Sequence, residues 1–401
     1  MARPSKQTLS ALSSFGNDFY SLRRGYDYKE GISSDGIALY GKNNDYPEKL
    51  LRLLGDSPWH YKGIKGSVKF IRANGLGITS DRGETITELT GFANIIGEDW
   101  QDIDEKISED LKIFNGFALQ VIWSNDGNSI ADVYHQPFAQ VRAGEKDEFG
   151  RVSNYYIGKW KRGRYNAKPD NADKIVAFNT ARSIEEPRQL LYCKFNNILS
   201  EYYPEPSYRG VIDNILIDKL LNKHKVAFLK NAINVASVMQ LVTDKSDKEF
   251  QKFVNDFDRN MSGAANSGRT AYLKVPVGGN FHQITNPNVK NNAEAFNSYY
   301  EQNRDIILAG HDVIYRDMFG IESTQASLAA DRVIEKSVLY NNTVAGEYHR
   351  KKLQGLNKLA PFIFGDARFA IRPLRLFEGL AQELEELGLM NPQSTIQEGN
   401  G

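Results

Sequence analysis

The stretch Pro204-Glu-Pro-Ser-Tyr-Arg-Gly210 opens the part of the chain that decides its fold, a part that extends to Tyr348. Its two prolines prevent a helix from crossing this opening. An apolar-rich run at 211–231 follows and predicts a long helix. A compact insert at 238–285 then separates this run from a second long helical run at 291–318. The order of segments predicts two long helices that flank a small module.

The insert contains the most clearly encoded helix of the chain. Ser246 with Glu249 three residues later forms a capping box, which satisfies backbone donors at the helix start. One face of the helix carries an apolar stripe of Phe250, Phe253, Val254 and Phe257, and the other carries Lys248, Lys252, Asn255 and Arg259. Strands are predicted at 236–242, 270–275 and 281–285. A module of about fifty residues has a marginal core, so we expect neighbouring copies to support it in an oligomer.

The segments around this part predict an α+β protein. The second helix ends at Phe319-Gly320, and a polar loop leads to a third helix at 328–356. A strand at 369–374, a short helix at 376–387 and a disordered tail are expected after it. Helices are predicted at 48–54, 57–71 and 102–114, followed by a mostly antiparallel meander with strands at 117–123, 130–134, 138–142, 153–160, 174–178 and 190–195.

The composition limits the possible functions. A chain of 401 residues should fold as two or three units. Its 50 basic and 50 acidic residues give a net charge of zero, which argues against a protein that grips DNA phosphates tightly. The single cysteine, Cys193, excludes an intrachain disulfide and is expected to be a small buried hydrophobe. With no apolar run of membrane-spanning length, we expect a soluble protein made in a reducing compartment, without a membrane partner.

No constellation of residues predicts catalysis, a metal site or a cofactor. The six histidines are not spaced for a shared metal, and His311 is expected to be a satisfied core histidine. The acidic pairs Asp102/Asp104 and Glu109/Asp110 are expected at a helix start or on its polar face. A nuclease with an unrecognised acidic site nevertheless stays open as an alternative.

A basic stripe lies on the first long helix. Lys219, Lys223 and Lys230 fall on one helical sector, which they share with Ile212 and Val226. The stripe is either a solvated face, which we favour because Asp213 and Asp218 dilute its charge, or a surface near passing DNA.

Five sequence segments make the chain resemble the portal proteins of tailed bacteriophages, in particular those of long-tailed phages. They are Tyr134-His-Gln-Pro-Phe-Ala-Gln-Val-Arg142, Tyr203-Pro-Glu-Pro-Ser-Tyr208, Phe228-Leu-Lys-Asn231, Ala265-Asn-Ser-Gly-Arg269 and Gly320-Ile-Glu-Ser-Thr-Gln325. The resemblance covers about 40–380 and rests on the order of segments more than on a sharp motif.

The resemblance implies a division of the chain into portal parts. These are a flexible N-terminal arm (1–35), a wing (36–204), a first stem helix (205–233), a clip (234–288), a second stem helix (289–318), a tunnel loop (319–327), C-terminal wing or crown helices (328–390) and a disordered tail (391–401).

The resemblance also implies a function. The protein would be a non-enzymatic ring of usually twelve subunits at one capsid vertex, assembled in the host cytoplasm and retained in the virion. Double-stranded DNA would pass weakly bound along a channel lined at the tunnel loop by Gly320, Ile321, Glu322, Ser323, Thr324 and Gln325. The clip residues Lys248, Lys252, Asn255 and Arg259 would dock the terminase and then the head–tail connector, and major capsid and scaffold proteins would surround the ring. Another virion connector or a minor capsid protein is the remaining alternative.

Overall fold

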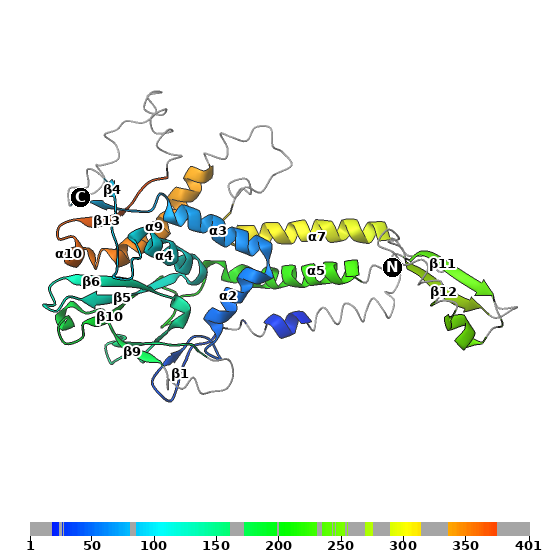
Figure 1. The fold of residues 1–401 in the computed structure, drawn as a ribbon, viewed down its shortest axis with the longest axis horizontal. Helices are drawn as coiled ribbons and strands as arrows, with labels where there is room; N and C mark the ends of the chain where they lie inside the picture. The colour runs from blue at the N-terminus through cyan, green and yellow to red at the C-terminus, as the bar shows by residue number, and fades with distance from the viewer. Residues whose placement is uncertain are drawn as a thin grey trace, which may run out of the picture. The chain divides into compact units, whose positions relative to one another are not determined.

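The computed structural model describes residues 18–23, 26, 28–80, 86–160, 172–198, 200–230, 235–242, 244, 246–252, 255, 269–275, 289–313 and 336–374 (Figure 1). The chain divides into two compact units. The larger comprises Met1–Leu216 with Arg304–Gly401, and the smaller comprises Ile217–Asn303. Helices α5 (Ile212–Lys230) and α7 (Val289–Ala309) each have residues in both units.

Three helices of the larger unit form where the sequence predicts them. They are α2 (Tyr46–Asp56), α3 (Pro58–Arg72) and α4 (Trp100–Phe114). The side chain of Ser57 caps α3 by accepting from the His60 amide, and Asp99 and Asp102 form a capping box at the start of α4. Helix α4 ends at Asn115, whose φ of 61° is a left-handed conformation that asparagine tolerates well.

A six-stranded mixed sheet follows α4 in the chain. Its order is β6-β5-β10-β9-β8-β7, and every pair is antiparallel except β9 with β10. The strands are β5 (Gly116–Trp123), β6 (Ile130–Gln136), β7 (Val141–Ala143), β8 (Asn154–Ile157), β9 (Asp173–Ala177) and β10 (Arg188–Lys194). The predicted meander is thus wrong in the middle of the sheet, where the last strand, β10, lies between β5 and β9.

The strand predicted at 138–142 is wrong in its first three residues. Residues 138–142 begin as a 3-10 turn, η2 (Phe138–Gln140), and only Val141 onward is extended. The turn forms because the Gln140 amide bonds to the Pro137 carbonyl, which lets the Phe138 ring enter the core against Phe114.

The C-terminal helix covers one face of this sheet. Residues 336–340, a π-helical segment at Asn341–Ala345 and α9 (Gly346–Leu356) form the described part of the predicted third helix. Figure 1 shows α4 and α9 on the same side of the sheet. Gly355 permits the close approach, since a Cβ there would lie 2.5 Å from the Phe117 ring and 2.7 Å from the buried Cys193 sulfur. The expected burial of Cys193 is confirmed.

Smaller elements complete the larger unit. Strand β13 (Arg368–Ile371) pairs with β3 (Leu76–Thr79), which pairs with β4 (Ile86–Glu88), and α10 (Ala360–Ile363) precedes β13. Strands β1 (Gly31–Ile32) and β2 (Ala38–Leu39) form a separate hairpin. Glu30, just before β1, accepts hydrogen bonds from the Tyr28 hydroxyl and from the successive amides of Glu201, Tyr202 and Tyr203. This end of the predicted N-terminal arm therefore packs on its own chain.

The smaller unit contains a strand–helix–strand module. Strands β11 (Val235–Val242) and β12 (Arg269–Val275) are parallel, and helical residues 247–252 lie between them in the chain. Such a pair needs a crossover connection. The predicted capping box is confirmed, with the Ser246 amide 3.1 Å from a Glu249 carboxylate oxygen. Phe253, Val254, Phe257, the strand at 281–285, the helix at 376–387 and the tail lie outside the described residues.

Helix α7 ends at Ala309, nine residues before the predicted end at Met318. Gly310 lies so close to Val211 that an added Cβ would be 2.2 Å from a Val211 methyl group, and Asp312 has a φ of 62°. The chain turns here because His311 and Val313 enter the core of the larger unit. In the part of the chain that the structure describes, no helix is long and apolar enough to cross a lipid bilayer.

Candidate functional site

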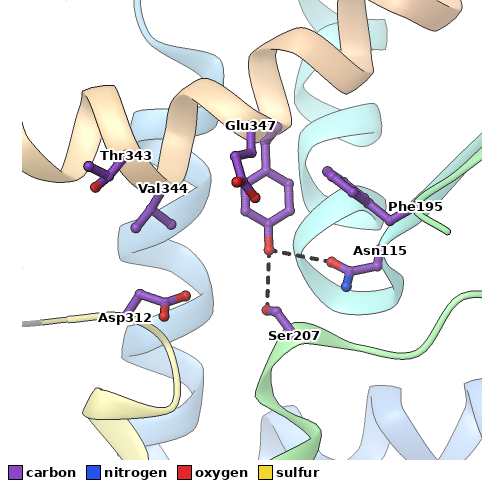
Figure 2. Close-up of a pocket in the computed structure, with 8 residues that line it drawn as sticks. Asn115, Phe195, Ser207, Asp312, Thr343, Val344 and Glu347 are labelled. Atoms are coloured by element: carbon purple, nitrogen blue, oxygen red, sulfur yellow. Dashed lines mark hydrogen bonds between the residues drawn. The ribbon is translucent and has the colours of Figure 1, made fainter. Parts of the chain in front are cut away.

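A pocket of about 300 Å³ lies in the larger unit, where the 3-10 turn before α5 (Ser207–Val211), the residues just after α7 and the C-terminal helix meet. Figure 2 shows the side chains that line it: Asn115, Phe195, Ser207, Asp312, Thr343, Val344, Glu347 and Tyr348. Thr343 and Val344 belong to the π-helical segment. Segments far apart in the sequence thus contribute to one cavity.

A hydrogen-bond network forms the wall of this pocket. The Tyr348 hydroxyl lies 3.2 Å from Ser207 Oγ and 3.4 Å from Asn115 Oδ1, as the dashed lines of Figure 2 show. Because a phenol has one proton, it donates to one of these acceptors at a time. The Lys112 ammonium group, fully buried, donates to Ser207 Oγ at 3.3 Å and lies 5.5 Å from the centre of the Tyr348 ring.

Two carboxylates at the pocket, Asp312 and Glu347, are exposed to solvent. The pocket therefore combines acceptor groups with one buried cation beneath them. Among the described residues no cluster of histidine, cysteine and acidic side chains could hold a metal ion. The contacts of Lys112 and Tyr348 with Ser207 join α4, α9 and the segment before α5.

A buried histidine pair attaches the end of α7 to α3. His60 Nδ1 lies 2.9 Å from His311 Nε2, both rings are inaccessible to solvent, and the Tyr208 ring packs against both. Burial lowers the pKa of His60 to about 3 and holds the pKa of His311 well below its usual value, with Lys112 acting in the same direction. The pair is neutral at pH 7. His311 is buried as predicted, but it is not fully satisfied, because its Nδ1 has no hydrogen-bond partner among the described residues.

A buried ion pair attaches α9 to α3 and α4. The Lys352 ammonium group donates to Asp104 Oδ1 at 2.6 Å, to the Ile71 carbonyl at 2.8 Å and to Ser108 Oγ at 3.3 Å. Asp104 was expected on a polar helix face, and this is wrong because α3 and α9 cover that face. Asp110 is also buried, but where α4 packs on β6: its Oδ2 lies 2.8 Å from His135 Nε2 and accepts from the Phe138 amide at 3.1 Å.

The two segments that border residues 314–335 are both fixed to α3. On one side His311 bonds to His60, and on the other the Tyr340 hydroxyl lies 2.8 Å from Ser67 Oγ. The chain before and after the predicted tunnel loop is therefore held by one rigid helix.

The residues singled out from the sequence lie elsewhere. Lys219 is partly exposed and Lys223 exposed on α5, whereas the side chain of Lys230 lies outside the described residues. Lys248, Lys252 and Asn255 are exposed, consistent with a polar face. Arg259 and the loop Gly320–Gln325 lie outside the described residues. What these residues bind stays a prediction.

The sequence did not point to the pocket. Ser207 lies in the portal-like segment 203–208, and Asn115 is predicted to end a helix. Neither pattern indicates that the two residues line one cavity. Tyr348 and Lys112 carry no local signal, because they meet only through the packing of α9 on α4.

Comparisons by sequence find no relatives: no protein-family model matches the chain, and no curated protein is similar to it.

Solved structures, in contrast, share the fold. A chain in the neck of the empty gene transfer agent particle, reconstructed with C6 symmetry, matches with a TM-score of 0.59 and 11% identity, covering 88% of this chain and 92% of that one. A chain in the neck of the native particle, reconstructed with C12 symmetry, gives 0.57 and 10%, covering 93% and 94%. A HK97-family phage portal protein from Corynebacterium diphtheriae gives a TM-score of 0.41 and 10% identity, covering 83% and 97%. The chain has the α+β fold of the particle-neck chains.

Proposed function

We propose that this chain is a portal protein: a subunit of the ring at one vertex of a tailed particle, through which DNA enters and leaves. The observation that carries the proposal is the fold shared with particle-neck chains over nearly the whole length of both proteins. A partial match would fit a common module in unrelated proteins, whereas a match over about nine-tenths of both chains fits a common role. The C12 symmetry of one matching neck supports a ring of twelve copies.

The charge of the chain suits this role. Each phosphate that a protein neutralises adds affinity without regard to sequence, so a channel with a large basic surplus would hold DNA instead of letting it slide. Equal numbers of basic and acidic residues avoid such retention. We further propose that α5 and α7 serve as the stem helices of the channel and that Gly320–Gln325 forms the constriction. In the same proposal Lys248, Lys252 and Asn255 dock the packaging motor and later the tail connector.

The first test is the assembly state of the purified protein. Native mass spectrometry and negative-stain images viewed down the ring axis should show a closed ring of about twelve subunits with a central hole. A protein that stays monomeric at every concentration would contradict the proposal. Divalent-metal-dependent cleavage of DNA would instead favour the nuclease alternative.

A second test adds positive charge to the proposed constriction. Glu322→Lys with Ser323→Lys should slow DNA packaging and make DNA retention by the ring salt-dependent, since each added ammonium group neutralises a phosphate. The matched control Glu322→Gln with Ser323→Thr removes the native charge without adding a positive one and should package normally. A normal packaging rate at low salt for the lysine variant would show that this loop does not face the DNA.

A further inference from the structure

The loop between β4 and α4 exposes a large apolar surface. Phe92 is 74% exposed, Ile95 85% and Ile96 70%, and we refer to these three residues as the apolar knuckle. Single exposed apolar side chains are common, but three large ones on one short loop form a patch of the kind that marks an interaction site.

The knuckle is held rigidly. The buried Asn94 side chain donates to the Val133 carbonyl at 3.0 Å and to Glu98, and it also accepts from the Glu98 amide. The Ile95 amide donates to Asp132 Oδ1 at 2.7 Å, and the Val133 amide donates to the Ala93 carbonyl at 2.8 Å. These bonds attach the loop to strand β6 and present its apolar side chains outward, where they are ready to be covered without a change of backbone.

The surroundings of the knuckle are acidic. Residues 86–105 contain six aspartate or glutamate residues and no lysine or arginine. Four of the six pair with basic side chains from elsewhere in the chain: Glu88 with Arg372, Glu98 with Lys106, Asp104 with Lys352 and Glu105 with Arg72. Asp99 and Asp102, and with them the adjacent Asp132, form no ion pair within the described part of the chain. The patch is therefore apolar at its centre and negative at its rim.

The same chain carries a segment of opposite charge. Residues 159–168, Lys-Trp-Lys-Arg-Gly-Arg-Tyr-Asn-Ala-Lys, contain five basic residues and no acidic one. The segment follows β8, and its described beginning is fixed beside β7, because the Trp160 indole donates to the Gln140 carbonyl at 2.8 Å and stacks on Arg142. Residues 161–171 lie outside the described part of the chain.

The knuckle and the described start of the basic segment, Lys159 and Trp160, lie at opposite edges of the six-stranded sheet. The knuckle is attached to β6, the first strand in the sheet order, whereas the basic segment starts beside β7, the last. Five strand spacings separate these edges by roughly 24 Å. This arrangement is compatible with a ring, because head-to-tail contacts join two different surfaces of identical subunits.

We propose that the apolar knuckle of one copy receives the basic segment 159–168 of the next copy around the ring. This inference depends on the ring proposed above. It assigns the two complementary surfaces through which neighbouring subunits of that ring would bind. The apolar side chains of the knuckle pack against the aliphatic stems of the incoming basic residues, and Asp99, Asp102 and Asp132 neutralise their charges. Interfaces commonly combine an apolar centre with a charged rim in this way.

Two charge-changing variants test the contact. Variant A carries Ile95→Lys and Ile96→Lys, both at exposed positions, and variant B carries Lys161→Glu, Arg162→Glu and Arg164→Glu. Each alone should raise the subunit concentration needed for half assembly by at least about tenfold, since like charges then meet across the interface. Mixed in equal amounts, A and B should assemble, because alternating copies pair the lysines of A with the glutamates of B and leave the other interfaces native.

Controls separate folding from assembly. Ile184→Lys with Ile198→Lys adds the same charge at two other exposed isoleucines and should leave assembly unchanged. The thermal unfolding midpoint of A, B and this control, measured on unassembled protein, should equal that of the wild type. Size-exclusion chromatography and native mass spectrometry report the assembled fraction.

Each other outcome overturns a different statement. If the wild-type protein forms no ring, the proposed function fails. If the wild type and both variants assemble equally, the function stands and the contact is wrong. If A and B combined in one chain assemble but their mixture does not, the segment covers the knuckle of its own chain. If B assembles normally but retains less DNA, the basic segment contacts DNA and not a neighbouring copy.

Discussion

Replacing Lys352 by methionine is expected to lower the free energy of unfolding of the larger unit by about 3–5 kcal/mol. Lys352 and Asp104 are both completely buried, and the ammonium group has three acceptors within 3.3 Å. Removing it leaves the buried carboxylate with only the Arg72 guanidinium as a counter-ion, whose Nε lies 4.0 Å from Asp104 Oδ2. At that distance Arg72 forms no hydrogen bond to Asp104 Oδ2, which has no hydrogen-bond partner among the described residues, so Arg72 compensates only in part.

A comparison of three variants assigns the loss to the unpaired charge. Lys352→Met with Asp104→Leu removes both charges and should recover most of the stability, because a well-packed apolar pair often replaces a buried ion pair without cost. Arg350→Met, at an exposed position on the same helix, should be nearly neutral. The measurement is the denaturant midpoint at constant m-value. A double variant as unstable as Lys352→Met would show that lost packing, not lost charge, dominates.

Acidification from about pH 7 to about pH 5 is expected to destabilise the larger unit by about 2 kcal/mol through His60, and His311 adds to this loss in the same direction. Both imidazoles titrate near pH 6.5 in the unfolded chain, whereas burial lowers the pKa of His60 to about 3 and that of His311 well below its usual value. The unfolded state therefore binds more protons in this range. Stability contributed by the neutral pair is complete above pH 6.5 and is lost as the pH falls toward the folded pKa values.

The double variant His60→Gln with His311→Gln isolates this effect. Its absolute stability will be lower, but the additional loss between pH 7 and pH 5 should shrink by at least about 2 kcal/mol. The buried carboxyls of Asp104 and Asp110, whose pKa values burial raises, contribute an opposite slope in both proteins and cancel from the difference. Equal pH slopes for the two proteins would show that the pair is not buried and neutral in solution.

Both predictions concern the attachment of the proposed channel elements. The histidine pair fixes the end of α7 to α3, and the ion pair fixes α9 to α3 and α4. In the proposed portal, forces on the constriction loop would pass to the body through these two points and through Tyr340, which bonds to Ser67 of α3. Weakening either attachment should therefore lower the free energy of unfolding of the larger unit.

Local elements could be predicted from the sequence because their signals lie within a few residues. The capping box at Ser246 and Glu249 forms as predicted, as does the helix stop at Asn115, and the strands of the sheet lie close to the predicted ranges. The order of long helices around a small module also sufficed to indicate the fold that the solved structures share.

Contacts between distant residues were decided by the tertiary structure alone. His60 meets His311 across 251 positions and Lys352 meets Asp104 across 248, and no local pattern indicates that the members of either pair meet. The end of α7 shows the same limit: its sequence remains compatible with a helix to Met318, but burial of His311 and Val313 and the contact of Gly310 with Val211 turn the chain at Ala309. Helical periodicity and capping are written in neighbouring residues, whereas the pocket, the ion pair and the turn depend on free energy that exists only once α3, α4, α7 and α9 have packed together.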